Sequence, residues 1–310
     1  MAPVLRALRE GLRGGSARLA AAVYLYVAAL AFAWLAAAPF AAALHGALDG
    51  QPGADRMTAG GGLEVLEEMS RSGATLWPAG LVGVGPLALA FVPLALVLAG
   101  GTYGLASGTP AWPWTAFWTE GARRFPEFLG FAILAAVYAA ATGAVAWGAI
   151  AGISAAFREP SGPAAYWTGI GLVVVVAAFA VLHARTVLGF AFARPGAGTG
   201  GRLLPGFALA VSFCWRHLPA THGIGALFLA LQASSALLGL AAGRVAGQGG
   251  WCSAVLAQAG WLGVAWLRAA EVRARVAYAF PASGAVVHRE ETDGESDTLS
   301  RGTEGPTCDP

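Results

Sequence analysis

The sequence predicts an all-α polytopic membrane protein with six transmembrane helices and interfacial amphipathic helices. The first observation behind this prediction is a series of long stretches without Asp, Glu, Lys or Arg, the longest of which covers residues 72–119. A helix needs about 20 apolar residues to cross a bilayer core, and each stretch supplies them. The second observation is composition, because charged residues make up 12% of the chain, against about 25% in ordinary soluble domains.

The uncharged stretches place six spans along the chain. The predicted spans are residues 19–43, 79–100, 129–152, 166–185, 222–243 and 250–268. The first is longer than the apolar region of a signal peptide, which is about 7–15 residues, so we expect an uncleaved helix. Pro86 and Pro93 fall in the second span and predict either a packing kink or a gating hinge.

The distribution of arginine predicts the orientation. Thirteen arginines flank the spans on the side of the N-terminus and four flank them on the other side. Because basic loops are retained in the cytoplasm, both termini are expected there. All 19 basic residues are arginine, a bias typical of a GC-rich bacterium, so the expected location is the bacterial cell (inner) membrane.

The chain changes character after residue 280. Residues 1–280 are predicted to form one six-span transmembrane domain. Residues 281–310 are rich in Gly, Ser, Thr and Pro and carry seven carboxylates against two arginines. Such a segment has too little apolar surface to fold, so we expect a disordered acidic cytoplasmic tail.

Amphipathic segments precede the first, third and fifth spans and are typical of helices that lie in the headgroup layer. These segments are residues 4–18, 114–125 and 203–217. The last two also share a join to the following span, Phe125-Pro126-x-x-x-Gly130 in one and Leu218-Pro219-x-x-x-Gly223 in the other. This similarity predicts a threefold helical-hairpin repeat. Its units would cover residues 4–100, 112–193 and 204–280.

A succession of motifs carries a resemblance to a known group. Gly100-Gly101 is followed by Trp114, Phe117-Trp118 and Gly121-Ala122-Arg123-Arg124-Phe125, and then by a new span. This order resembles a broad group of six-span bacterial integral membrane proteins of uncharacterised function, which includes the membrane domain attached to some glycerophosphodiester phosphodiesterases. The resemblance covers most of residues 1–280 and implies an architecture. We expect the catalytic domain of that group to be absent, so the resemblance implies no catalytic residues.

Three polar residues in or at the ends of the spans are candidate site residues. Gln232 and Gln258 either bond to each other and hold two spans together, or line a path for a polar substrate. His183 either lies at the interface beside Arg185 or relays protons. A relay needs further ionisable groups at depth, and no Asp or Glu lies within any predicted span.

Arginines at the ends of the spans or beyond them are candidates for binding anionic lipid headgroups, at about 1 kcal/mol per basic group. The five candidates are Arg123, Arg124, Arg268, Arg273 and Arg275. Helical spacing places Arg268, Glu271 and Arg275 on one face. The alternative is that these arginines reflect the basic bias of cytoplasmic loops alone.

Small residues predict close helix contacts. Gly148 and Gly152 are four residues apart in the third span, and Gly239 and Gly243 in the fifth. Such pairs allow helix backbones to approach, either within one bundle or between two chains. The alternative is that they arise by chance in a chain with 44 glycines.

Catalytic, metal and cofactor sites are not expected. The three cysteines lack metal-ligand spacing, and the acidic residues at 64–68 lack a calcium-loop pattern. We therefore expect no enzyme, no cofactor and no nucleic-acid partner.

The expected function is a non-enzymatic accessory or organising component that acts through helix packing and a basic cytoplasmic face, with membrane lipid and a membrane protein as partners. The alternatives are a permease-like subunit or carrier for a neutral or lipidic substrate, and a lipid-associated regulatory membrane domain.

Overall fold

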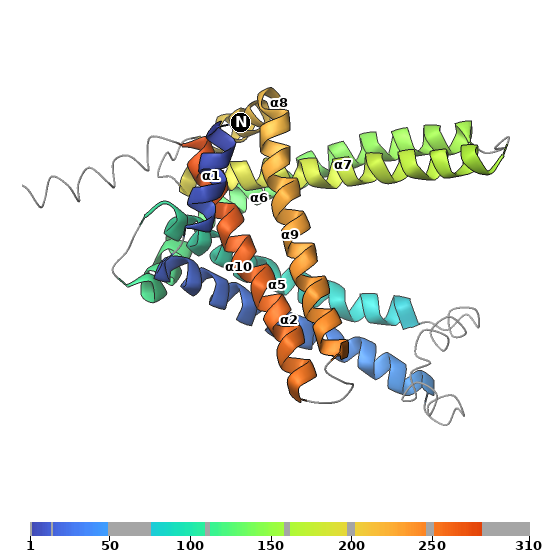
Figure 1. The fold of residues 1–310 in the computed structure, drawn as a ribbon, viewed down its shortest axis with the longest axis horizontal. Coiled ribbons are helices and arrows are strands. Elements are labelled where there is room, and N and C mark those ends of the chain that lie inside the picture. Colours follow the sequence, from blue (N-terminus) through green and yellow to red (C-terminus); the bar gives the residue numbers. More distant parts are fainter. Residues whose placement is uncertain are drawn as a thin grey trace, which may run out of the picture. The chain divides into compact units, whose positions relative to one another are not determined.

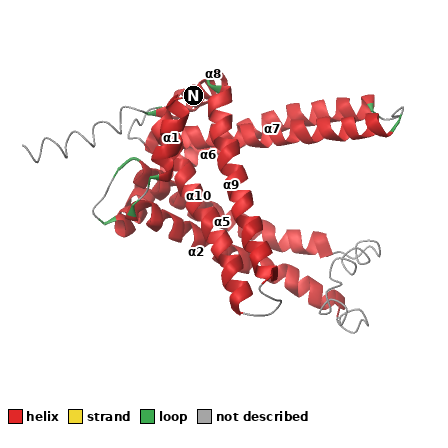
Figure 2. Ribbon diagram, in the orientation of Figure 1, coloured by secondary structure: helices red, strands yellow, loops and turns green. Residues whose placement is uncertain are grey.

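A computed structural model describes residues 2–13, 15–48, 76–108, 112–157, 162–196, 202–245 and 251–280. Within these ranges the regular structure is α-helical, without β-strands (Figure 2). This confirms the predicted all-α class. The predicted tail at 281–310 and the acidic residues at 64–68 lie outside the described residues.

Eight helices make up this part of the chain (Figure 1). They are α1 (Ala2–Leu12), α2 (Ser16–Leu48), α5 (Leu76–Ala106), α6 (Pro113–Ala156), α7 (Pro163–Gly196), α8 (Leu203–Arg216), α9 (Leu218–Val245) and α10 (Trp251–Ala279). Proline marks two helix starts, because Pro113 begins α6 and Pro163 begins α7. At the first helical position the missing N–H of proline costs no hydrogen bond.

Five of these helices are long and apolar enough to cross a membrane. The apolar stretches are Ser16–Pro39, Val84–Ala106, Pro113–Ala156, Pro163–Arg194 and Leu218–Gly243. They overlap the first five predicted spans. The sixth predicted span, residues 250–268, corresponds to the first part of α10, which begins at Trp251. Ser253, Gln258 and Arg268 lower its mean hydropathy, and α10 is not among the five helices that are apolar enough to cross a membrane.

The chain divides into two compact units. Unit 1 comprises Met1–Val23 and Val97–Pro310, and unit 2 comprises Tyr24–Leu96. Unit 2 contains the greater part of α2 and of α5, whose rings of Phe32 and Phe91 lie 4.6 Å apart between centroids. Both Pro86 and Pro93 lie inside α5, which continues past them to Ala106.

Unit 1 contains two helical hairpins. Helices α6 and α7 run side by side in Figure 1, as do α9 and α10. Helix α10 also packs against α1 and α7, and α8 contacts α6, α7 and α9. Helix α10 is therefore the element that joins the N-terminal helix to the two hairpins.

The packed core of unit 1 lies at the arginine-rich ends of its helices. Its largest buried aromatic side chains include Phe117 and Phe128 on α6, Phe190 on α7 and Phe228 on α9. The outer part of α6 is different, because Val145 is 75% exposed. The buried core thus lies at one end of these long apolar helices, and the exposed side chains of α6 lie further along it.

Small residues bring α9 and α10 into close contact. A Cβ atom added at Gly239 would lie 2.6 Å from the Cα atom of Gly260. Beside this contact, Ser235 Oγ donates a hydrogen bond to the Gly260 carbonyl oxygen at 3.0 Å. The packing predicted for Gly239 is present here. Gly148 and Gly152 on α6 instead face open space, with no other part of the described chain within 4 Å of an added Cβ.

The three predicted amphipathic segments take three different forms. Residues 4–18 run through α1 into the first turn of α2, and residues 203–217 correspond to the separate helix α8. Residues 114–125 are the start of α6, which continues through Pro126. Pro219 is the second residue of α9, where its missing N–H costs no hydrogen bond. Helix α8 ends at Arg216 and α9 begins at Leu218, so His217 separates the two helices. The two matching joins differ in structure, and the threefold repeat is not confirmed.

Candidate functional site

Among the described residues, a buried carboxylate surrounded by arginines forms a highly charged site, which we call the Glu271 cluster. It consists of Arg185 on α7, Gln232 on α9, and Arg268, Glu271 and Arg275 on α10. The side chains of Glu271 and Arg275 are fully buried. The cluster joins three helices through one carboxylate.

Both carboxylate oxygens of Glu271 accept hydrogen bonds. Oε2 accepts from Arg185 Nη2 at 2.6 Å and from Arg268 Nη1 at 2.8 Å. The same oxygen accepts from Gln232 Nε2 at 3.1 Å, and Oε1 accepts from Arg275 Nη2. A buried carboxylate with this many donors has its hydrogen-bonding capacity nearly filled.

Helix geometry explains the place of the cluster. Arg268 and Arg275 lie three residues before and four residues after Glu271, so all three share one face of α10. Glu271 follows Trp251 by 20 residues, which in a helix is about 30 Å, the thickness of a bilayer core. Glu271 therefore lies just beyond the predicted span 250–268 and not within it.

Two glycines make room for Arg275. Its guanidinium group occupies the space that a Cβ atom at Gly189 on α7 would fill, and its Nη2 atom lies 3.7 Å from the Cβ position of Gly225 on α9. Arg275 Nη1 also donates to the carbonyl oxygen of Arg185 at 3.3 Å. Tyr103 of α5 donates to the carbonyl oxygen of Gly189 at 2.8 Å. Helices α5, α7 and α10 are thus joined around one guanidinium group.

The charges of the cluster determine the ionisation of Glu271. Burial acts to raise the pKa of this carboxyl, but the charges of Arg275, Arg268 and Arg185 outweigh burial and lower the pKa to about 2. Three guanidinium groups and one carboxylate leave an excess of two positive charges. A carboxylate that stays ionised and saturated with donors is suited to hold helices together and not to exchange protons.

A second polar group joins α6, α7 and α9 through two histidines. His183 Nδ1 lies 3.0 Å from His222 Nε2, and both side chains are buried. Tyr138 Oη lies 2.7 Å from His183 Nε2, and His222 Nδ1 lies 3.0 Å from the carbonyl oxygen of Leu218. The ring of Phe179 stacks on both imidazoles.

The carbonyl of Leu218 sets the direction of this chain of hydrogen bonds. A carbonyl only accepts, so His222 Nδ1 donates to it and, with neutral rings, His222 Nε2 accepts from His183 Nδ1. His183 Nε2 then accepts from the hydroxyl of Tyr138. Every ring nitrogen has a partner, so the pair forms a complete polar connection between apolar helices.

The five arginines predicted to bind lipid headgroups fall into three environments. Arg123 and Arg124 both pair with Glu120 of the same helix at 2.7 Å. Arg268 and Arg275 belong to the Glu271 cluster. Arg273 is partly exposed and has no ion-pair partner among the residues that the structure describes.

The three candidate polar residues of the predicted spans also lie in different environments. Gln232 lies in the Glu271 cluster, where its Oε1 accepts from Arg185 Nη2 at 3.1 Å. His183 pairs with His222, and Gln258 is exposed on α10. Sequence reasoning missed His222 and the inward role of Arg185. Both lie at the ends of predicted spans, where a polar residue is normally interpreted as facing the headgroup layer. No local pattern therefore indicated that their side chains point into the protein.

Within the described ranges, no group of three or more His, Cys, Asp or Glu side chains could hold a metal ion.

Comparisons with protein families, curated proteins and solved structures found no match for this chain. The resemblance to the membrane domains of certain phosphodiesterases stays a prediction from the sequence motifs.

Proposed function

We propose that this protein is a non-enzymatic accessory component of the bacterial cell membrane, which binds and organises another membrane protein. In this proposal the chain crosses the membrane six times, with both termini and the basic face in the cytoplasm. The Glu271 cluster then extends from the cytoplasmic boundary of the bilayer, where Glu271 lies, to Gln232 within the fifth span. Its role is to hold α7, α9 and α10 in one arrangement.

The observation that carries the proposal is the contrast along α6. At its arginine-rich end Phe117, Gly121 and Phe128 are buried, whereas Val137 and Val145 further along the helix are exposed. A packed end holds the base of the hairpin of α6 and α7, and no other described part of the chain covers its apolar sides further along. Lipid covers such sides by default, but the open Gly148–Gly152 face also admits a second helix at close range.

The transport alternative has less support. A carrier for a neutral substrate needs polar groups that line a path, and Gln232 was the leading candidate for that role. Both the oxygen and the nitrogen of its amide bind inside the Glu271 cluster. This amide therefore supports helix packing better than substrate binding.

Native mass spectrometry tests the accessory role. The tagged full chain is extracted gently from its own membrane and weighed with whatever remains bound. We expect a stoichiometric protein partner. A chain that carries instead a defined small molecule, and no protein, would replace the accessory role with transport or lipid handling.

A matched pair of variants tests the contact face. Gly148→Leu fills the open face of α6, whereas Ala139→Leu adds bulk at an exposed position on the opposite side of the same helix. We expect the partner to be lost with Gly148→Leu and retained with Ala139→Leu. Equal retention in both variants would remove α6 from the proposed contact.

The proposed orientation has its own test in whole cells. Cys252 is exposed at the start of α10, on the face opposite to the proposed cytoplasmic termini, and Cys308 lies in the C-terminal tail. A membrane-impermeant maleimide should label Cys252 in intact spheroplasts and Cys308 only after permeabilisation. The reverse pattern would invert the topology.

A further inference from the structure

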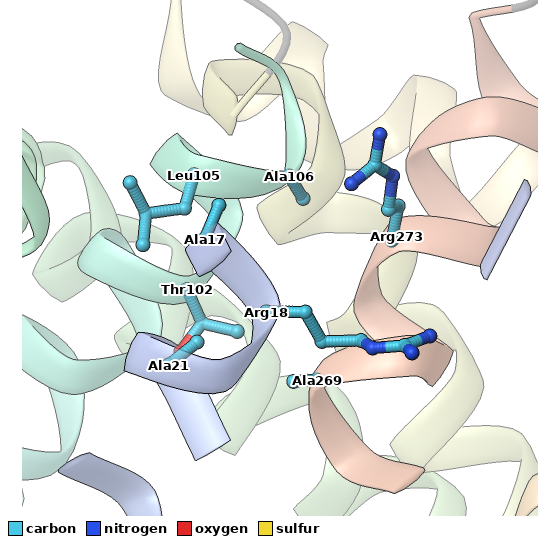
Figure 3. Close-up of a pocket in the computed structure, with 8 residues that line it drawn as sticks. All are labelled: Ala17, Arg18, Ala21, Thr102, Leu105, Ala106, Ala269 and Arg273. Carbon is cyan, nitrogen blue, oxygen red and sulfur yellow. The ribbon is translucent and has the colours of Figure 1, made fainter. Parts of the chain in front are cut away.

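A small hollow lies in unit 1 where the start of α2 and the end of α5 meet α10 (Figure 3). Arg18 and Ala17 border it from α2, Arg273 from α10, and Thr102 and Leu105 from α5. Its volume is about 10 Å³, room for about one water-sized group. Its described lining carries two guanidinium groups and no carboxylate.

Arg18 is held in place by contacts that leave part of its guanidinium group unpaired. Nη1 donates to the carbonyl oxygens of Gly11 at 2.8 Å and Leu12 at 2.5 Å, at the C-terminal end of α1. The guanidinium lies over the ring of Trp266, 3.7 Å from its centroid. Although Arg18 is only 8% exposed, its Nε atom has no hydrogen-bond partner among the residues that the structure describes. A buried, unpaired donor on a charged group is costly unless a ligand satisfies it.

Arg273 supplies a second charge without a counter-ion. Its neighbours on α10, Arg268 and Arg275, pair with Glu271, but Arg273 has no ion-pair partner in the part of the chain that the structure describes. Arg18 and Arg273 lie close enough for their like charges to repel one another. An anion between them would reverse the sign of that interaction.

The level of the hollow indicates the kind of anion. Its lining residues lie at or just beyond the ends of the predicted spans 19–43, 79–100 and 250–268, which is headgroup depth. Arginine recognises phosphate through paired N–H donors. Ala21 and Ala269 add an apolar edge on the side of the spans.

We infer that Arg18 and Arg273 form a binding site for the phosphate group of an anionic phospholipid headgroup or of free phosphate. One phosphate oxygen occupies the hollow, and the guanidinium groups bind it from α2 and α10. Thr102 already donates to Leu98 at 2.7 Å, so it shapes the hollow and does not bind the anion. This inference goes beyond the accessory role, because the site binds phosphate whether or not a protein partner is present.

Native mass spectrometry of the purified full chain in mild detergent tests the site. Short-chain phosphatidylglycerol and phosphatidylcholine are titrated separately. We expect the wild-type chain to bind phosphatidylglycerol more tightly, and Arg273→Gln to weaken that binding about fivefold, which corresponds to about 1 kcal/mol for one basic group. Arg216→Gln is the matched control, because it removes an exposed arginine outside the hollow, and its effect should stay below about twofold.

A second variant tests the hollow without a change of charge. Ala106→Leu adds bulk at its edge and should also weaken phosphatidylglycerol binding. Inorganic phosphate identifies the source of the ligand. Phosphate that displaces the lipid from the wild-type chain assigns the site to soluble phosphate, and phosphate that fails to displace it assigns the site to the lipid headgroup. Equal losses with Arg273→Gln and Arg216→Gln, or equal binding of both lipids, would overturn the inference.

Discussion

The carboxylate of Glu271 lies 2.6 Å from the guanidinium group of Arg185, although 86 residues separate them in the chain. This pair joins α10 to α7. Gln232 of α9 binds the same oxygen. One buried carboxylate therefore links three helices of unit 1.

Gly189→Ala should destabilise the protein because the added methyl group would occupy the position of the Arg275 guanidinium group. Overpacking of this kind costs about 1–3 kcal/mol. The measurement is the thermal midpoint of the chain in detergent. Gly143→Ala is the control, since its Cβ meets open space and alanine favours a helix over glycine by up to about 1 kcal/mol. A loss of stability in both variants would show that the space beside Arg275 is not special.

Tyr138→Phe should also lower stability, because it removes the donor to His183 Nε2 and leaves a buried acceptor unpaired. The expected cost is about 1–3 kcal/mol. Tyr166→Phe removes a hydroxyl from a tyrosine that is 52% exposed and should leave the thermal midpoint unchanged. If the two variants unfold at the same temperature, the hydrogen bond between Tyr138 and His183 does not stabilise the fold.

Cys214 should resist thiol reagents. Burial raises the pKa of this thiol to about 12, an effect that the charge of Arg275 only partly offsets. In a Cys308→Ser background in detergent at pH 7, maleimide should label the exposed Cys252 first and Cys214 about a hundredfold or more slowly, since the thiolate is the reactive form. Peptide mapping by mass spectrometry gives both rates. Comparable rates would mean that α8 readily detaches from the rest of unit 1 and exposes Cys214.

The pKa of Glu271 predicts a specific pH dependence. Because the pKa of the folded state, about 2, lies below the ordinary value of 4.5, the stabilisation from this group is complete above pH 4.5 and is lost as the pH falls toward 2. The difference in thermal midpoint between the wild-type chain and Glu271→Gln should stay constant from about pH 7 to pH 5 and shrink at lower pH. A difference that already shrinks between pH 7 and pH 5 would mean that the arginines do not outweigh burial.

The helical class and five apolar helices follow from local properties. An uncharged stretch of adequate length predicts a membrane helix wherever its neighbours lie. The shared face of Arg268, Glu271 and Arg275 follows in the same way from helical spacing. These features are encoded within one helix each.

Contacts between helices did not follow from local patterns. Arg185 ends one predicted span and Gln232 lies in the middle of another, and nothing near either residue indicates a partner on α10. His183 and His222 are 39 residues apart, and their meeting depends on the packing of α7 against α9. The joins at Pro126 and Pro219 have similar sequences, yet only the first lies inside a continuous helix. Local motifs were insufficient where tertiary packing decides the outcome.

The thermal midpoint of Glu271→Gln tests the central claim, that this carboxylate holds the helices of unit 1 together. Breaking a buried ion pair costs about 3–5 kcal/mol, because the opposite charges stay buried without a partner. Glu10→Gln is the matched control. It removes an exposed partner of Arg13, at 3.2 Å, and such surface pairs contribute at most about 1 kcal/mol. We predict a large fall in the thermal midpoint for Glu271→Gln and almost none for Glu10→Gln. An equally small change in both variants would contradict the account.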